Sequence, residues 1–275
     1  MMPHRRSFGS PWIVAVLLVV GIASVRAASA EVRPGLTDPR PGPALRACDT
    51  CFAGGPLLAR ASLWYGLGAV ACVAVTIPQD RWLTEEATES SSPAALRLSR
   101  LAQPLGNAFV LLPATAVVYG IARWKSHAAL AGSAERVAAS ILVTGAATLV
   151  LKEAIGRLRP HESQNDALVF QPFSAHSSFP SGHASVAFAV ATMLAEEHPS
   201  WEIRCLAYGA ASLVAWSRVR DGEHWTSDVV AGAALGIWAA SGVEHAMRSD
   251  DRAARRWSGL TTRLDPSGVA IAWRF

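Results

Sequence analysis

The sequence predicts an all-α bundle of about six helices that is integral to a membrane or associated with one. Hydrophobic residues make up 51% of the 275 residues and charged residues 17%, whereas soluble domains carry roughly 25% charged residues. The apolar segments lack the alternation of apolar and polar residues that marks a half-buried strand. Gly and Ala recur within them and let helix backbones approach closely, as in membrane bundles. A tightly packed soluble bundle has the same composition and stays an alternative.

Six apolar segments are the predicted helices, and they lie near residues 58–78, 105–122, 137–155, 183–196, 203–217 and 227–246. The polar stretch 79–103 separates the first two, and its later part is expected to form an amphipathic surface helix. Together these segments define a helical domain at 57–247. The fourth segment is about 14 residues long, which is short for a spanning helix of roughly 20 residues. The number of spanning helices is therefore left open.

Residues 1–30 are expected to be an export signal. Arg5 and Arg6 form a basic start, a short apolar run follows, and Ala28-Ser29-Ala30 fits a small-residue cleavage site. An uncleaved membrane anchor is the alternative. Residues 31–56 are rich in Pro and Gly and are expected to form a linker. Either way, the chain is expected to be sent across or into a membrane.

The C-terminal residues 248–275 are expected to form a basic tail that ends in a strand-like segment. The last seven positions alternate large apolar side chains with Ala or Arg. One strand cannot close a barrel, so this segment is predicted to be an appendage. The net charge of +4 comes mainly from scattered Arg residues, a pattern that argues against nucleic acid as a partner.

The four cysteines carry weaker signals. Cys48 and Cys51 fit a tight disulfide in an oxidising compartment, with a redox or metal pair as the alternative. Cys72 and Cys205 lie in apolar stretches and are expected to be core residues.

Three polar clusters interrupt the apolar segments and together predict a site for a tetrahedral oxyanion. They are Lys152 to Arg159-Pro160, Pro180-Ser181-Gly182-His183, and Ser217-Arg218 to His224 and Asp228. So much positive charge among apolar residues needs a partner, and a bound phosphate is the simplest one.

Each cluster alone has an ordinary explanation. Lys152 and Arg159 near a helix end fit a solvated cap. Ser181 is a natural N-cap, and the N–H groups of the helix start favour an anion. His224 and Asp228 are four residues apart, so the carboxylate can orient the imidazole, although the pair also fits a structural hydrogen bond.

Taken together, the clusters resemble the signature of the phosphatidic acid phosphatase type 2 (PAP2) / vanadium haloperoxidase superfamily, namely KxxxxxxRP, PSGH and SRxxxxxHxxxD. Every specified position is matched between residues 152 and 228. The resemblance implies that His224 is the nucleophile, Asp228 orients it, and His183 is the general acid and later the base. It also implies a set of phosphate-binding residues: Lys152, Arg159, Ser181, Gly182 and Arg218.

The resemblance further implies phosphoester hydrolysis without a cofactor or divalent metal. The expected substrate is a phosphorylated lipid, such as phosphatidate, a polyprenyl diphosphate or lipid A. A non-specific acid phosphatase, a vanadate-dependent haloperoxidase and a lipid-binding bundle with a decayed site are the alternatives. Oligomeric state is not indicated.

Neighbouring residues give further expectations. Arg157 and Arg220 are expected at the surface or at lipid headgroups, and Trp225 is expected to pack as a lid or interface residue. His176 can line the entrance or be a solvent-exposed loop residue. Basic residues at 123–136 and in the tail lie at the end opposite the clusters, so the positive-inside rule predicts a periplasmic, non-cytoplasmic site.

Overall fold

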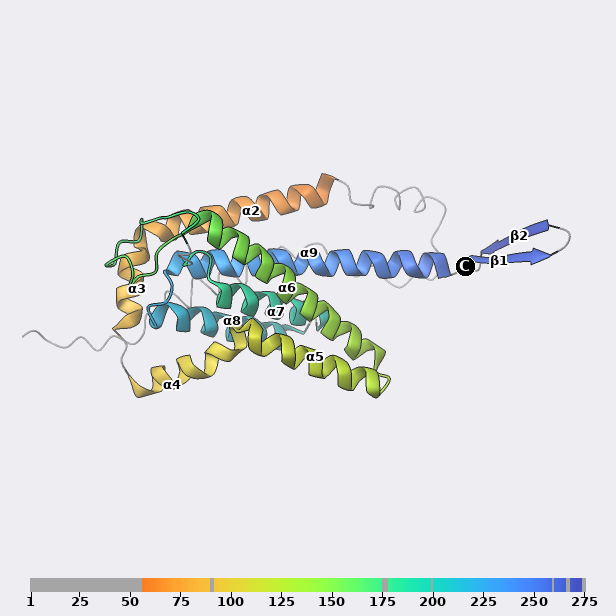
Figure 1. The fold of residues 1–275 in the computed structure, drawn as a ribbon, viewed down its shortest axis with the longest axis horizontal. Coiled ribbons are helices and arrows are strands. Elements are labelled where there is room, and N and C mark those ends of the chain that lie inside the picture. The colour runs from red at the N-terminus through yellow and green to blue at the C-terminus, as the bar shows by residue number, and fades with distance from the viewer. Residues whose placement is uncertain are drawn as a thin grey trace, which may run out of the picture.

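The computed structural model describes residues 56–89, 92–174, 178–198, 200–258, 260–265 and 268–273. Helices dominate this part of the chain, which confirms the predicted fold class (Figure 1). The helices are α2 (Pro56–Thr76), α3 (Asp80–Thr88), α4 (Pro93–Ala102), α5 (Ala108–Trp124), α6 (Ala128–Ile155), α7 (Gly182–Glu197), α8 (Trp201–Arg220) and α9 (Thr226–Ser258). Short 3-10 turns, η1 (Ile77–Gln79) and η2 (Gln103–Gly106), follow α2 and α4. Strands β1 (Leu260–Asp265) and β2 (Gly268–Trp273) end the described part.

The six predicted apolar helices correspond to α2 and α5 to α9. The expected amphipathic helix is α4, which begins where the Ser92 hydroxyl accepts a hydrogen bond from the N–H of Ala95 at 3.2 Å. Helix α3 was not predicted, because its sequence is mostly polar and shows no long apolar period. The expected export signal and most of the linker, with Cys48 and Cys51, lie outside the described residues.

The C-terminal region differs from its prediction in two ways. Helix α9 continues to Ser258, beyond the expected end near residue 246, since residues 243–258 contain no Pro or Gly and several strong helix formers. The strand-like segment does not stand alone. It is β2, paired antiparallel with β1 from Leu260↔Trp273 to Asp265↔Gly268.

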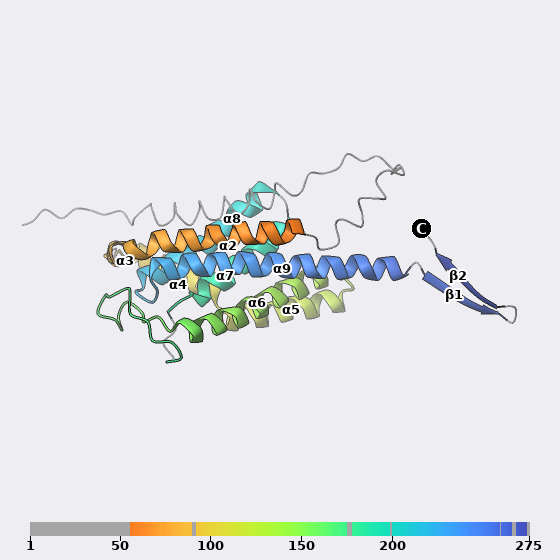
Figure 2. The same cartoon turned by 90° about the horizontal axis from the view of Figure 1, so that it is seen from above.

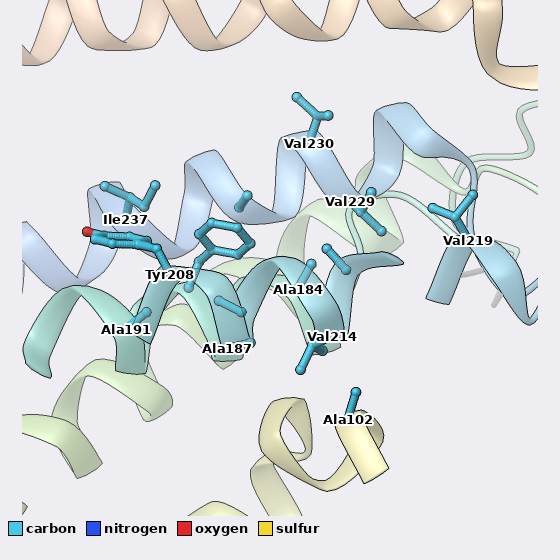
Figure 3. Close-up of a cluster of buried hydrophobic side chains, with 14 of the residues drawn as sticks. Ala102, Ala184, Ala187, Ala191, Tyr208, Val214, Val219, Val229, Val230 and Ile237 are labelled. Atoms are coloured by element: carbon cyan, nitrogen blue, oxygen red, sulfur yellow. The ribbon is translucent and has the colours of Figure 1, made fainter. Parts of the chain in front are cut away.

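The core lies where α7 packs between α8 and α9. Figure 3 shows small side chains of α7, Ala184, Ala187 and Ala191, facing apolar side chains of the two neighbouring helices. Phe188 and Tyr208 pack against each other with ring centroids 6.1 Å apart and ring planes tilted by 46°. Helix α6 also contacts α7 and α9, and α2 runs beside α9 (Figure 2). The small side chains of α7 thus allow it to pack closely between its two neighbours.

Two glycines of α9 allow its close approach to α7. A Cβ atom on Gly232 would lie 2.6 Å from the carbonyl oxygen of Ser181, and one on Gly236 would lie 2.1 Å from that of Ser185. These glycines are four residues apart and form the small-residue face that membrane helices use for tight packing. Since Ser181 immediately precedes α7, this crossing also sets the distance between the two helix starts.

Replacing Gly236 by Ala is therefore expected to lower the free energy of unfolding by about 1–3 kcal/mol, the usual cost of overpacking a core. Gly242→Ala on the same helix is the matched control, because nothing lies within 4 Å of the added Cβ atom. Thermal unfolding of both variants in the same detergent checks the prediction. Equal stability of the two variants would contradict it.

The outer faces of the bundle are apolar, as expected for helices in lipid. Two helices of the described part are long and apolar enough to span a membrane, Ala128–Ile155 and Thr226–Ser249. A third span results if Pro93–Gly106 and Ala108–Trp124, bent by 58°, count as one. The exposed large side chains include Trp64, Val70, Phe109, Val117, Leu142, Leu149 and Val150.

The expectation for Cys72 and Cys205 was wrong, because both are exposed. In a membrane bundle apolar residues face the lipid as well as the core, so an apolar stretch does not indicate which residues are buried.

Candidate active site

All three sequence clusters meet at one end of the bundle. The end of α6, the start of α7, the end of α8 and the start of α9 lie together there (Figures 1 and 2). The connection from α6 to α7 covers the same end. Residues that are far apart in the sequence thus form one site.

The start of α7 carries two of the predicted phosphate-binding residues. Ser181 is the N-cap residue, as predicted, but its hydroxyl makes no capping bond. Its Oγ is buried without a hydrogen-bond partner among the described residues, and its N–H donates to the carbonyl oxygen of Asp228 at 3.0 Å. Lys152 reaches the same place, because a Cβ atom on Gly182 would lie 3.9 Å from its Cε atom. A hydroxyl, helix N–H groups and an ammonium group therefore converge.

Arg159 and Arg218 form the second part of the cationic cluster. One carboxylate oxygen of Glu223, Oε2, contacts both guanidinium groups, lying 3.5 Å from Nη2 of Arg218 and hydrogen-bonded to Nη1 of Arg159. Burial lowers the pKa of Arg218, and the carboxylates of Glu223 and Asp221 oppose that shift. The two guanidinium groups thus share a single carboxylate, next to His224 in the sequence.

His183 lies among these cations. Its pKa is lowered to about 4, first by burial and then by the nearby charges of Arg218, His224 and Lys152. His183 is therefore close enough to His224, Arg218 and Lys152 for their charges to shift its pKa. In the free protein at neutral pH, the imidazole of His183 is uncharged.

His224 lies just before α9 and is 3% exposed. Its Nδ1 atom is 3.7 Å from Oδ2 of Asp228, slightly beyond hydrogen-bond distance, and has no hydrogen-bond partner among the described residues. Burial lowers the pKa of His224, and Asp228 opposes that shift. Nδ1 is thus the ring nitrogen near the Asp228 carboxylate.

Asp228 is fixed by its position in the first turn of α9. Its Oδ2 atom accepts hydrogen bonds from the N–H of Trp225 at 3.0 Å and from the Ser178 hydroxyl. The bond to Trp225 is the acidic half of a capping box, in which the third helical residue reaches back to the N-cap N–H. Asp228 therefore stabilises the start of the helix and also faces His224.

The expectation for Arg157 and Arg220 was wrong, because both side chains are buried. Arg157 is 1% exposed and donates to Oδ1 of Asp228 at 2.6 Å. Arg220 is 8% exposed and pairs with Asp221 at 3.0 Å. A carboxylate partner offsets the cost of burying each charge, and the partner of Arg157 could not be read from its sequence neighbours.

Trp225 packs inside the protein and does not form a lid. It is 1% exposed, and its Nε1 donates to the carbonyl oxygen of Leu158 at 3.0 Å. The Arg157 guanidinium lies 5.5 Å from the centroid of its ring, a favourable cation–π distance. His176 lies outside the described residues.

Sequence reasoning missed one buried residue of this region, Asp80 at the start of α3. It is 0% exposed and accepts hydrogen bonds from Arg157 at 2.8 Å and from the N–H of Ser227 at 2.7 Å. The sequence signal that could have identified Asp80 is its place as a single acidic residue shortly after the apolar segment 58–78. Within the described residues, no group of three or more His, Cys, Asp or Glu residues is arranged to hold a metal ion.

Comparison with known proteins agrees with this geometry. Residues 134–250 match the sequence profile of the PAP2 superfamily. This segment contains all three clusters, so the part of the chain that carries the site is similar to the PAP2 superfamily.

Individual relatives match over parts of their length. The chain is 38% identical to a lipid A 1-phosphatase of Rhizobium johnstonii over 36% of this chain and 41% of the relative. It is 30% identical to an undecaprenyl-diphosphatase of Sulfolobus acidocaldarius over 48% of this chain and 61% of the relative. It thus spans less than two thirds of these curated relatives.

A solved structure supports the fold. A transmembrane PAP2-type phosphatidylglycerolphosphate phosphatase from Bacillus subtilis superposes with a TM-score of 0.54 at 23% identity, over 68% of this chain and 96% of that chain. The similarity confirms the helical fold.

Proposed function

We propose that this chain is a phosphatase that hydrolyses a phosphomonoester or diphosphate of a lipid through a phosphohistidine intermediate. The observation that carries the proposal is the convergence of His183 and His224 with Lys152, Arg159 and Arg218 at one end of a membrane bundle. The named relatives, a lipid A 1-phosphatase and an undecaprenyl-diphosphatase, support a phosphorylated lipid as the substrate.

In the first step, Nε2 of His224 attacks phosphorus, and the bond to the leaving oxygen breaks. Asp228 accepts a hydrogen bond from the Nδ1–H of His224 and stabilises the positive charge that forms on the ring. His183 gives its proton to the leaving oxygen. The products are a lipid alcohol, or a lipid monophosphate from a diphosphate, and a phosphorylated His224.

In the second step, His183 takes a proton from a water molecule, whose oxygen attacks the phosphorylated His224. The P–N bond breaks, inorganic phosphate leaves, and both histidines are restored. The phosphoryl oxygens are held throughout by three cations and by donors of α7: Lys152, Arg159, Arg218, the Ser181 hydroxyl and the Gly182 N–H. These groups are positioned before the reaction, so they stabilise developing charge without reorganising.

The protonation of His183 is coupled to substrate binding. In the free protein, burial and then the nearby cations hold its pKa at about 4. A bound phosphate brings negative charge into the same space, offsets those cations and raises the pKa. His183 thus becomes a proton donor when a substrate is present.

The α6–α7 connection supports a lipid substrate. It exposes Leu168 by 65% and Phe173 by 81%. Its backbone is held to the end of α6, because the N–H of Phe173 donates to the carbonyl oxygen of Glu153 at 2.9 Å. Phe173 is thus held at the end of α6 that carries Lys152, where an acyl or prenyl chain would follow a bound phosphate.

Replacing Phe173 by Asn is expected to raise the KM for a lipid phosphate in micelles by about 5-fold, since loss of partial apolar burial costs about 1 kcal/mol. Asn tolerates the positive φ of 59° found at this position. The kcat/KM for a soluble ester should change by less than about 2-fold. Trp124→Asn, at the exposed far end of α5, is the control, and an equal loss with both substrates would contradict the prediction.

The site is proposed to face the periplasm, and residues 1–30 are proposed to direct export. Arg123, Lys125 and Arg136 lie between or near the far ends of α5 and α6, and basic residues concentrate on the cytoplasmic side of membrane proteins. Phosphate release by intact cells from an impermeant phosphoester would test this orientation.

The proposed function is tested with a panel of phosphatidate, undecaprenyl diphosphate, lipid A and a soluble phosphoester. The purified wild type is compared with His224→Ala in every assay. Release from at least one lipid above this blank is expected. Release from the soluble ester alone would support an acid phosphatase instead, and no release above the blank would refute the proposal.

A further inference from the structure

A buried arginine connects the catalytic end of α9 to helix α3. The Nη1 atom of Arg157 donates to Oδ1 of Asp228 at 2.6 Å, and its Nη2 atom donates to Oδ2 of Asp80 at 2.8 Å. The three side chains are 1%, 0% and 0% exposed. One guanidinium group thus bridges two fully buried carboxylates.

The bridge is closed by the first turn of α9. Asp80 accepts from the N–H of Ser227 at 2.7 Å and from the Ser227 hydroxyl, and Arg157 donates to that same hydroxyl at 2.7 Å. A carboxylate near a helix N-terminus satisfies N–H groups that have no partner within the helix. Two carboxylates therefore bind the N–H groups at the start of α9. Asp80 belongs to helix α3, and Asp228 belongs to α9 itself.

The Arg157 side chain also contacts a backbone carbonyl group and two aromatic rings. Its Nε and Nη2 atoms both donate to the carbonyl oxygen of Ala167, at 3.0 and 2.6 Å. Its guanidinium carbon lies 5.6 Å from the ring centroid of Phe170 and 5.5 Å from that of Trp225. The planar guanidinium has a fixed fork of donors, so these contacts define the position of both carboxylates.

We infer that Asp80 and Arg157 are positioning residues that hold the Asp228 carboxylate in the orientation from which it serves His224. We call Asp80, Arg157 and Ser227 the clamp. This inference rests on the proposed function, because it assigns the clamp a role in that reaction. Asp80 lies outside residues 134–250, the segment that matches the superfamily, so this part of the clamp comes from the N-terminal helices.

The charges of the clamp favour the proposed chemistry. One guanidinium between two carboxylates leaves an excess of one negative charge beside His224. That excess stabilises a positively charged imidazole ring, the form that His224 takes when it is phosphorylated. Without Asp80, the charge of Arg157 would offset Asp228 and weaken this stabilisation.

The experiment compares Asp80→Asn and Arg157→Gln with the wild type, each also in an Asp228→Asn background. Asp80→Asn keeps the shape and an oxygen acceptor for the N–H of Ser227. It is expected to lower kcat about 10- to 100-fold, the usual effect of residues that orient a reactive group, while KM changes less than about 2-fold. In the Asp228→Asn background, the further loss should disappear, because the clamp acts through Asp228.

A matched variant separates positioning from general stability. Arg136 pairs with Glu197 at 2.8 Å, between α6 and α7 at the other end of the bundle. Glu197→Gln removes a partly buried ion pair far from the site. It is expected to lower the Tm without changing kcat. An Asp80→Asn variant with wild-type kcat, or a loss that multiplies fully with that of Asp228→Asn, would overturn the inference.

A second measurement does not depend on turnover. The imidazole of His224 is faced by Asp228, His183, Lys152 and Arg218 and can be titrated by NMR in histidine-labelled protein. Asp80→Asn should lower its pKa and Arg157→Gln should raise it, because the two variants remove opposite charges. If the wild type releases no phosphate, the proposed function fails, yet opposite shifts still support the clamp. Absence of both shifts overturns it.

Discussion

Replacing His224 by Ala is expected to lower phosphate release at least about 10⁴-fold, because loss of a covalent nucleophile removes the entire reaction path. The imidazole is 3% exposed and lies 3.7 Å from the Asp228 carboxylate, and no other histidine is proposed to attack phosphorus. Steady-state release from the best lipid of the panel measures the effect.

The matched control for this variant is His198→Ala. His198 follows α7 at the end far from the site and is exposed. Its replacement should leave kcat/KM within about 2-fold of the wild type. Phosphate release by His224→Ala at the rate of His198→Ala would rule out His224 as the nucleophile.

Trapping the intermediate provides independent evidence. Labelled phosphate should remain on the wild type after a rapid alkaline quench, be lost in acid, and be absent from His224→Ala. Asp228→Asn should still bind substrate but form the phosphoenzyme about 10²- to 10⁴-fold more slowly, as when the carboxylate partner of a catalytic histidine is neutralised. A label that survives acid would indicate another nucleophile.

The sequence was sufficient to predict the helical fold, and the three clusters that it singled out lie at the same end of the bundle. The six apolar segments became helices, and the spacing of the three clusters placed Lys152, Ser181 and Arg218 at the ends of helices that meet. The roles of these residues remain predictions. Local patterns were informative here because each cluster lies at the boundary of an apolar segment, where a helix must begin or end.

The sequence was not sufficient where burial depends on distant residues. Arg157 lies in a polar connection and has the sequence context of a surface residue. It is buried because Asp80, 77 positions earlier, provides a counter-charge. The exposure of Cys72 is the opposite case, since its apolar sequence context does not place it against other helices. The burial of Arg157 and the exposure of Cys72 do not follow from the spacing of apolar residues, because both depend on which helix surfaces come into contact after folding.

Replacing His183 by Asn is expected to have an effect that depends on the leaving group. For an alkyl ester such as phosphatidate, kcat/KM should fall about 10³-fold, because the departing alkoxide needs a proton. For p-nitrophenyl phosphate it should fall less than about 10-fold, since p-nitrophenolate leaves as a stable anion and Lys152, Arg159 and Arg218 still hold the phosphoryl group. Equal losses for both substrates would contradict the role of His183 as the acid.

The same variant separates the two proposed tasks of His183. With p-nitrophenyl phosphate, His224 should be phosphorylated rapidly, while hydrolysis of the intermediate lacks its base. A burst of one p-nitrophenolate per active site should therefore precede slow turnover, and the phosphoenzyme should accumulate.

In the wild type, an NMR titration of His183 should give a pKa near 4 without ligand and a higher value with vanadate bound, because the anion offsets the surrounding cations. A pKa that vanadate leaves unchanged would show that His183 does not face the bound oxyanion, and the protonation cycle proposed here would then be wrong.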